Sequence, residues 1–478
     1  MTNNQIPEEV IGQVMDQTDI VELVGKYVQL SRKGKNYVGL CPFHSEKTPS
    51  FTVAPDKRIY HCFGCGNGGN AIKFVMEVDG LTFKEAVAEL AEPLNIPISW
   101  TSYEQTGDDP EQSLRSKLIK AHELSAKLYH YILKNTEHGK RAMDYLNKRG
   151  ITGKMINTFQ IGYAPAAWET LCQFLEQRSF DLKDMAVGGL ITERSSGGYV
   201  DRFRDRIMFP IFDPQGKIIA FSGRVLGDGM PKYLNSPETP IFNKSRLLYN
   251  YHLAKKSVRQ SKELILFEGF IDVLMAWSAG IENGVATMGT ALTEAHAKQI
   301  KRIAERVIIC YDGDEAGQAA AEKSLNILHQ VQSTPIVAIL PKKIDPADYI
   351  QNEGADRFVK EILQQAVTAT KFKLLRLEQS YNTTQEDGRL EYIRSALQLI
   401  AALPSPTERE HYLKDLAQDY DYSLDALKQE ISGIRRDLEK KRRNGDKKRF
   451  QWNNVMNETA AKGDPVLLPA YHNAERHL

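Results

Sequence analysis

Cysteine is scarce in this sequence, which has five cysteines among 478 residues. So few cysteines exclude a disulfide scaffold for a chain of this length. Three of them, Cys41, Cys62 and Cys65, nevertheless fall in one short segment. This clustering predicts a metal site in a reducing compartment, and we expect a cytoplasmic protein.

Long apolar runs and an excess of charge are also missing. No stretch approaches the roughly 18 consecutive apolar residues that a membrane helix needs, and the opening residues MTNNQIPEEV do not resemble a signal peptide. We therefore expect no membrane contact. Because the net charge is only +1, a nucleic-acid partner would have to be bound by local basic clusters. Such clusters occur at 31–35, 202–206 and 435–449, although the last is also typical of a solvated helix end and linker.

The length of the chain and its changes of pattern predict several domains. A helical pattern over 7–30 is followed by alternation typical of short antiparallel strands over 37–43 and 51–63. The polar stretch 101–113 is typical of a linker. Between 263 and 341, short apolar runs alternate with helical stretches, which predicts a parallel sheet with crossover helices.

A C-x2-H…C-x2-C pattern with seventeen intervening residues is formed by Cys41, His44, Cys62 and Cys65. Zinc prefers four tetrahedral nitrogen or sulfur ligands, and two short turns would each present one pair. Because four protein ligands leave no open coordination position, we expect one structural zinc ion. His61 is a weaker alternative to His44, because it adjoins Cys62 and should point away from the metal.

Aromatic and basic residues are interleaved around this zinc pattern. The rings belong to Tyr37, Phe43, Phe51, Tyr60 and Phe63, and the cations to Arg32, Lys33, Lys35, Lys47, Lys57 and Arg58. Aromatic rings stack on unpaired bases while cations contact phosphates, which favours single-stranded nucleic acid. The alternative is that most of these rings form the small core, and both explanations can hold for different rings.

Acidic residues stand where two strands of the expected parallel sheet end. Glu268 follows the apolar run 264–267, and Asp312 and Asp314 follow the run 307–310. Ligands bind beyond the carboxyl ends of strands in open α/β sheets, so these carboxylates should converge there. Their mutual repulsion requires a cation, and oxygen ligands select magnesium, with manganese as a substitute. The alternatives are a helix N-cap for Asp314 and an isolated edge charge for Glu268.

Arginines occupy alternate positions in the stretch 201–211. They are Arg202, Arg204 and Arg206. This period predicts that they share one face of a strand. With Arg224 and Lys232 further on, they could form a phosphate cradle for a nucleotide or template, since guanidinium groups bind phosphate in a bidentate way. Salt bridges to Asp201 and Asp205 are the alternative.

Taken in order, these motifs resemble the DnaG-type bacterial primases. The motifs are the zinc pattern, DRFRDRIMFPI (201–211), KYLNSPET (232–239), EGFID (268–272) and YDGDEAG (311–317). The resemblance covers residues 7–440 and implies a zinc-ribbon template-binding domain and an RNA polymerase domain centred on a Toprim fold. It further implies synthesis of short RNA primers on single-stranded DNA from ribonucleoside triphosphates, by metal-dependent nucleotidyl transfer.

The resemblance also assigns roles to individual residues. It implies a catalytic core of Glu268, Asp312 and Asp314 that holds two or more magnesium ions, with Asp272, Asp345 and Asp348 as accessory acidic residues. Template or nucleotide contacts are implied for Arg149, Arg202, Arg204, Arg206, Arg224, Lys232, Tyr233 and Asn235. One motif departs from the family, which often has Asp-Pro-Asp where this sequence has Asp345-Pro346-Ala347-Asp348. Which residue acts as the second ligand there stays open, although a helical turn starting at Pro346 would place Asp348 on a similar face to Asp345.

The expected domains follow from these motifs and from the resemblance. They are a zinc-ribbon domain (1–103), the N-terminal part of the polymerase domain (114–260), a Toprim subdomain (261–365), a helical subdomain (366–440), and a linker with the start of a helicase-binding domain (441–478). Because 469–478 resembles the first helix of the helicase-binding domain, we expect that domain to be truncated and the region that binds the replicative helicase to be largely absent. We also expect a monomer.

Two other classes of protein share parts of this pattern. A topoisomerase or Toprim nuclease would use the same carboxylates for strand cleavage, but the stretches 201–211 and 232–239 argue against it. A non-catalytic repair mediator with zinc and Toprim domains need not keep all the acidic ligands, which are intact here. A primase fused to a helicase is disfavoured because the sequence has no phosphate-binding loop of the G-x-x-x-x-G-K-[ST] type.

Overall fold

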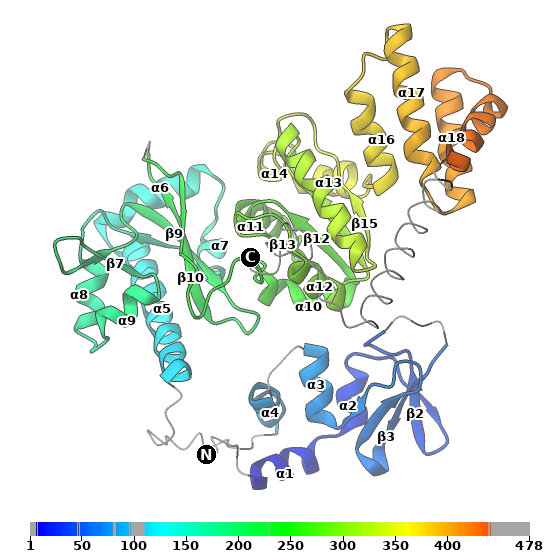
Figure 1. Cartoon of the computed structure of the whole chain (residues 1–478). Coiled ribbons are helices and arrows are strands. Elements are labelled where there is room, and N and C mark those ends of the chain that lie inside the picture. Colours follow the sequence, from blue (N-terminus) through cyan, green and yellow to red (C-terminus); the bar gives the residue numbers. More distant parts are fainter. Residues whose placement is uncertain are drawn as a thin grey trace, which may run out of the picture. The chain divides into compact units, whose positions relative to one another are not determined.

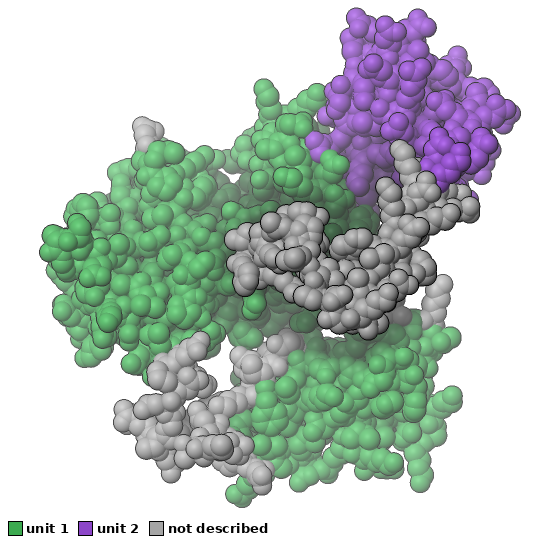
Figure 2. All heavy atoms as spheres, in the orientation of Figure 1, with its two compact units in different colours: residues 1–334, 340–360 green, residues 335–339, 361–478 purple. Residues whose placement is uncertain are grey.

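The computed structural model describes residues 6–440, apart from 7, 45, 47, 80–82, 95, 97–109, 228 and 438–439. Two compact units are formed (Figure 2), the first by residues up to 334 and 340–360, and the second by 335–339 and residues from 361 onward. Most of the expected linker 101–113 and all of the segment 441–478 lie outside the described residues. Among the described helices, none has the length and apolar character needed to cross a membrane.

The first unit begins with a small antiparallel sheet whose strands follow one another in sequence order. They are β1 (Ser31–Lys33), β2 (Asn36–Gly39), β3 (Phe51–Ala54), β4 (Ile59–Cys62) and β5 (Gly68–Gly69). Four helices share its apolar core: α1 (Glu8–Gln17), α2 (Ile20–Gly25), α3 (Ala71–Asp79) and α4 (Phe83–Ala91). The helix expected over 7–30 is two helices, because the Asp19 carboxylate caps α2 by accepting the backbone N–H groups of Val21 and Glu22.

A second antiparallel sheet follows, with the strand order β11-β10-β9-β6. Its strands are β6 (Gly162–Ala164), β9 (Arg206–Phe212), β10 (Ile218–Val225) and β11 (Tyr233–Asn235). The long helix α5 (Pro110–Asn135) packs on β6 and β10. Around this sheet lie α6 (Lys140–Lys148), α7 (Gly153–Thr158), α8 (Thr170–Glu176), α9 (Leu182–Val187), the hairpin β7 (Ile191–Glu193) with β8 (Tyr199–Asp201), and α10 (Tyr251–Ser261).

The alternation predicted between 263 and 341 produces a parallel sheet (Figure 1). The central strand β12 (Glu263–Phe267) pairs with β13 (Gly284–Ala286) on one side and β14 (Arg306–Cys310) on the other. The helices of this region are α11 (Phe270–Ser278), α12 (Glu294–Ile303), α13 (Glu315–Gln330), α14 (Pro346–Glu353) and the short α15 (Ala355–Arg357). Phe267 lies opposite both Ala286 and Cys310, so the loops after the three strands leave the sheet at one edge.

The second unit is largely helical. Its strand β15 (Thr334–Val337) pairs antiparallel with β16 (Val367–Thr368). Helices α16 (Ala369–Gln379), α17 (Glu386–Ala401) and α18 (Pro406–Tyr420) share an apolar core with a further helical stretch over 424–437. Helix α18 begins after Ser405, whose hydroxyl accepts the Glu408 N–H at 3.3 Å. The expected combination of a zinc ribbon, a mixed α/β region with a parallel sheet and a helical region is thus present.

Candidate functional site

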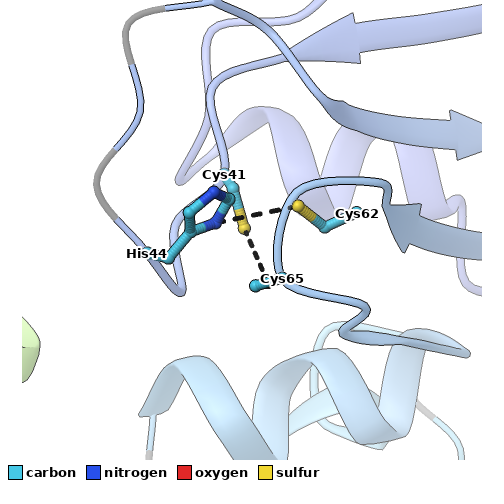
Figure 3. Close-up of side chains that lie close together, drawn as sticks. All are labelled: Cys41, His44, Cys62 and Cys65. Carbon is cyan, nitrogen blue, oxygen red and sulfur yellow. Dashed lines mark hydrogen bonds between the residues drawn. The ribbon is translucent and has the colours of Figure 1, made fainter.

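The four residues of the zinc pattern lie together at one end of the first sheet (Figure 3). Their candidate ligand atoms all fall within 4.8 Å of one another. Cys41 Sγ lies 3.8 Å from Cys65 Sγ, and Cys62 Sγ lies 3.7 Å from Nδ1 of His44. His61 is not part of this group, and its ring instead meets that of Phe63 edge-on. The arrangement fits one tetrahedral zinc ion held by four protein ligands.

Glu46 supports this cluster, and the sequence analysis missed it. Its carboxylate lies 3.4 Å from Nε2 of His44, while Nδ1 of the same ring faces Cys62. The carboxylate also accepts the backbone N–H groups of Cys41 at 2.8 Å and Ser50 at 3.0 Å, as well as the Ser50 hydroxyl. A carboxylate behind a metal-binding histidine fixes the orientation of its ring and makes it a stronger ligand. The sequence signal that could have identified Glu46 is its position two residues after the ligand His44.

The aromatic rings near the zinc pattern divide into two groups. Phe51 and Tyr60 are buried and stack at 5.3 Å, and Phe43 packs against both. The core explanation therefore holds for these three rings, and Tyr37 packs against the same core. Phe63, in contrast, is 75% exposed and is available to a ligand.

Most of the predicted acidic and basic residues line one pocket of 380 Å³ in the first unit. The acidic residues are Glu268, Asp272, Asp312, Asp345 and Asp348, and the other expected residues are Arg149, Arg224, Lys232, Tyr233 and Asn235. Asp314 is not among the lining residues, and its carboxylate caps α13 by accepting the Gly317 N–H at 2.8 Å. The N-cap alternative for Asp314 is therefore observed, but its charge still acts on Glu268 and Asp312.

The acidic residues strain one another electrostatically. Burial raises the pKa of Asp312 to about 7, and the nearby Glu268 and Asp345 raise it as well. Burial, followed by the charge of Asp314, raises the pKa of Glu268. Among the described residues, the buried Glu268 Oε2 has no hydrogen-bond partner. Clustered carboxylates with a buried free oxygen fit a divalent cation, which would remove the repulsion and bind that oxygen.

Asp272 is placed differently from the other acidic residues, because backbone groups hold both of its oxygens. Oδ2 accepts the Gly269 N–H and Oδ1 accepts the Ala347 N–H, each at 3.2 Å. Burial, followed by the charges of Asp312 and Asp345, raises its pKa well above the usual range. Asp272 therefore joins the end of β12 to the first turn of α14.

The altered Asp-Pro-Ala-Asp motif forms the helical turn that was considered for it. Pro346 is the first residue of α14, and the Asp345 carboxylate caps the helix by accepting the Asp348 N–H at 2.6 Å. Asp345 and Asp348 both line the pocket. Ala347 contributes its backbone N–H to Asp272 and has no side-chain oxygen or nitrogen to offer a metal.

Two guanidinium groups approach one aromatic ring on the basic side of the pocket lining. The Arg224 guanidinium lies between the rings of Tyr145 and Tyr233, at 5.2 and 5.0 Å from their centroids, and donates to the Tyr233 hydroxyl. The Arg149 guanidinium lies 5.8 Å from the Tyr145 centroid. Cations brought this close favour an anionic ligand such as phosphate. Tyr145 was not predicted, although it lies on α6 one helical turn before Arg149.

The prediction that Arg202, Arg204 and Arg206 share one strand face is wrong. Arg202 and Arg204 lie in the loop between β8 and β9, and only Arg206 belongs to a strand. Asp205 adopts a left-handed backbone with φ of 49°, which breaks the extended chain that the alternation would require. The alternate spacing of these arginines therefore does not show which way their side chains point.

Arg206 does not face the pocket either. It is 7% exposed, and its guanidinium donates to the carbonyl oxygens of Gly223 and Pro231, both at 2.9 Å. It thus anchors β10 and the segment before β11. The salt-bridge alternative is also not observed in the expected form, since Arg204 donates to the backbone carbonyl of Asp201 and not to its carboxylate.

Trp168 is an exposed residue that the sequence analysis missed. Trp168 is 58% exposed. The guanidinium groups of Arg204 and Arg194 lie 4.2 and 5.9 Å from the centroid of its ring. An exposed aromatic face with flanking cations is typical of sites where unpaired bases stack. We call Trp168, Arg194 and Arg204 the Trp168 platform.

Comparison with known proteins identifies the regions that carry these sites. Residues 6–106 match the CHC2 zinc finger, 128–255 the N-terminal domain of the DNA primase catalytic core, and 265–350 a Toprim-like domain. The DNA primase of Halalkalibacterium halodurans is 46% identical over 477 residues, which are 100% of this chain and 79% of that protein. The chain belongs to the DNA primase family.

Solved primase structures share its fold. The zinc-binding and RNA polymerase domains of the Aquifex aeolicus primase match with a TM-score of 0.54 and 30% identity, over 87% of this chain and 98% of that one. A DnaG primase catalytic domain bound to single-stranded DNA matches with a TM-score of 0.55 and 32% identity, over 65% of this chain and 98% of that one. The expected activity is confirmed: the chain is a DNA-directed RNA polymerase that synthesises primers. The zinc finger is also confirmed, and the Toprim-like domain implies a divalent metal.

The expectation of a truncated helicase-binding domain is wrong. Residues 370–439 match the DnaB-helicase binding domain of primase, so the region is not largely absent, and the match supports a helicase as a partner. Those residues form α16, α17, α18 and the helical stretch over 424–437, which were expected to be a helical subdomain (366–440) distinct from the helicase-binding domain. Helical periodicity predicts that such helices pack together, but it does not identify the partner that their outer surface binds.

Proposed function

We propose that the 380 Å³ pocket is the site where ribonucleotides are joined, with Glu268, Asp312 and Asp345 as the nearest ligands of magnesium. The observation that carries this proposal is the presence of five carboxylates and three cationic side chains in one pocket lining. A nucleoside triphosphate bound with magnesium needs both kinds of group. When bound, paired magnesium ions would activate the attacking hydroxyl and stabilise the leaving pyrophosphate. Asp314 would act through its charge, and Asp272 by positioning α14.

The basic residues of the pocket would bind the triphosphate. Arg224 is held between Tyr145 and Tyr233, so its guanidinium is already oriented before a phosphate arrives. Arg149 and Lys232 would contact other phosphate oxygens of the same ligand. Because phosphates are common to all four ribonucleotides, these contacts provide affinity without selecting a base.

The DNA template would contact two exposed aromatic sites. They are Phe63 of the zinc finger and the Trp168 platform, which carry rings that single-stranded bases can stack on. A primase catalytic domain of known structure is bound to single-stranded DNA, which supports DNA binding by the corresponding region of this chain. Trp168→Leu should raise the KM for template by roughly five- to 150-fold, since stacking contributes ~1–3 kcal/mol per base, and should leave the KM for nucleotides unchanged.

One assay separates this function from its rivals. The chain is incubated with single-stranded DNA, four ribonucleoside triphosphates and magnesium, and the products are resolved by size. Short RNA supports the proposal, cleaved or relaxed DNA would indicate a nuclease or topoisomerase, and DNA binding without product would indicate a mediator. Omitting magnesium and then adding manganese tests the choice of metal.

We further propose that the helical region 370–439 binds the replicative helicase, that the chain acts as a cytoplasmic monomer and that its zinc ion is structural. Helicase binding is supported by the family match of this region. Size-exclusion chromatography with light scattering, with and without a DnaB-type helicase, tests both the oligomeric state and the complex. A chain that elutes as a dimer alone would contradict the monomer.

A further inference from the structure

Asn235 ends β11 and contacts the loop that leaves the parallel sheet. Its Nδ2 donates to the carbonyl oxygen of Met288 at 3.4 Å. Gly289 lies against the same amide, and a Cβ there would be 3.4 Å from Nδ2. The side chain thus connects β11 of the antiparallel sheet to the loop that follows β13 of the parallel sheet.

This contact fixes the orientation of the amide. A carbonyl oxygen only accepts hydrogen bonds, so the NH2 group of Asn235 has to face Met288 and the Oδ1 atom has to face away. Asn235 Oδ1 is buried and has no hydrogen-bond partner among the described residues. A buried acceptor without a donor is destabilising, which is typical of sites where a ligand supplies the donor.

Asn235 and the metal-binding residues line the same pocket. Phe267 of β12 lies opposite Ala286 of β13, so Glu268 and the segment up to Met288 leave adjacent strands at one edge. Neighbouring strands lie about 4.8 Å apart. Met288, which the Asn235 amide contacts, therefore follows the strand next to the one that leads into Glu268, and both residues belong to the lining of this pocket.

The chemistry of the substrates narrows the possible donors. Phosphate groups offer acceptors and no donors at neutral pH. The four bases present different donors, and a template-directed polymerase has to accept all of them. The donors that all four ribonucleotides share are the ribose hydroxyls, and the 2′-hydroxyl is the group that deoxynucleotides lack.

We propose that Asn235 Oδ1 accepts a hydrogen bond from a ribose hydroxyl of the bound ribonucleotide and is a specificity-determining residue for this sugar. The inference rests on the proposed function of the pocket. A site built to bind a hydroxyl leaves its own polar group unpaired when the hydroxyl is missing, so it rejects the deoxy analogue strongly.

The test measures kcat/KM for adding one nucleotide to a preformed RNA primer on a DNA template. Ribonucleoside triphosphates are compared with their 2′-deoxy and 3′-deoxy analogues. The wild-type chain should disfavour the analogue that lacks the bound hydroxyl by roughly a hundredfold or more, and the two analogues tell which hydroxyl it is. Asn235→Ala should lose activity on ribonucleotides and keep its activity on that analogue, so that the preference falls at least about tenfold.

Two further variants keep the result interpretable. Asn235→Leu fills the volume of the amide and should reduce the preference in the same way, which covers the case in which alanine loosens β11. Arg149→Ala is the matched control, because ribonucleotides and their deoxy analogues carry the same phosphates. It should reduce kcat/KM for both kinds of substrate equally and leave the preference for ribonucleotides unchanged. If the wild-type chain adds no nucleotide, the proposed function fails. If the wild-type chain adds nucleotides and both Asn235 variants keep its preference against both analogues, this inference alone is wrong.

Discussion

The Asp272 carboxylate accepts the backbone N–H of Ala347 at 3.2 Å, across 75 residues of sequence. Its other oxygen accepts the N–H of Gly269, which lies in the turn between β12 and α11. One buried side chain therefore sets the distance between the loop that carries Glu268 and the helix α14 that follows Asp345. Asp272 is a positioning residue in this arrangement, because each of its carboxylate oxygens already accepts a hydrogen bond from a backbone N–H group.

Removing charge from the acidic cluster should stop synthesis and stabilise the metal-free protein. We expect Glu268→Gln and Asp312→Asn each to reduce magnesium-dependent primer synthesis by roughly a hundredfold or more. Since the pKa of Asp312 is raised to about 7, its carboxylate weakens the metal-free fold increasingly as the pH rises from 4 to 7. Asp312→Asn should therefore raise the metal-free Tm at pH 8, as followed by circular dichroism.

Asp272→Ala is the matched comparison for that experiment. It removes a carboxylate from the same cluster but leaves two buried N–H groups without an acceptor, which costs about 1–3 kcal/mol per group. Its metal-free Tm should fall where that of Asp312→Asn rises. Equal changes of Tm in the two variants would show that the effect of Asp272 on stability comes from its charge alone and not from its hydrogen bonds.

The altered acidic motif allows a ranking of its residues. Asp345→Asn retains a good helix N-cap, since asparagine caps as well as aspartate, so the fold should be unchanged. The magnesium concentration for half-maximal synthesis should nevertheless rise, because one negative charge leaves the pocket. Asp348→Asn should have a smaller effect, and Ala347→Asp should be tolerated in the presence of magnesium. The ranking is wrong if Asp348→Asn is as damaging as Asp312→Asn in a magnesium titration.

Zinc binding should depend on Glu46 as well as on the four ligands. Cys62→Ser should lose the metal and unfold the first sheet locally, while the parallel sheet melts as in the wild type. Glu46→Gln should keep zinc but bind it roughly 10–100-fold more weakly, because His44 loses its carboxylate partner. Competition with a chromophoric chelator measures both affinities. A full equivalent of tightly bound zinc in Cys62→Ser would contradict the ligand assignment.

Buried histidines should make the first unit sensitive to acid. Burial lowers the pKa of His122 from 6.5 to about 4, so this ring is neutral in the folded protein and protonated in the unfolded chain between these pH values. The folded state should therefore lose stability as the pH falls from 6.5 to 4, by an amount on the order of 3 kcal/mol from His122. Urea unfolding of the wild type and His122→Leu at pH 7.5 and pH 5 measures this, and the gap between them should shift in favour of the variant at pH 5.

The sequence predicted the sites whose geometry follows from spacing or from strand direction. Cys41, His44, Cys62 and Cys65 meet because two short turns leave them little freedom, and Glu268 lies beside Asp312 because parallel strands end at one edge. Arg206 illustrates the opposite case. Its burial depends on two carbonyl groups 17 and 25 residues away, and nothing in the local pattern shows them.

The other differences between the sequence-based predictions and the structure also arise from contacts that are distant in sequence, or from residues with two possible roles. Asp314 had two roles open to it, and the choice depended on where α13 begins. The acceptor role of Asp272 depends on Ala347, which is far away in sequence. Trp168 gave no periodic signal, since its importance comes from two arginines that approach it from elsewhere in the chain.

The four zinc ligands differ in how much of each is open to solvent. Cys41 is 8% exposed and Cys62 is fully buried, whereas Cys65 lies at the surface. A chelator or an oxidant can therefore reach the zinc site through Cys65, while Cys62 is shielded from solvent. Exchange of the ion should then proceed stepwise, with the bond to Cys65 breaking first. The lifetime of the bound zinc would then depend most on the exposed Cys65 and the partly exposed His44, even though the affinity is shared among four ligands.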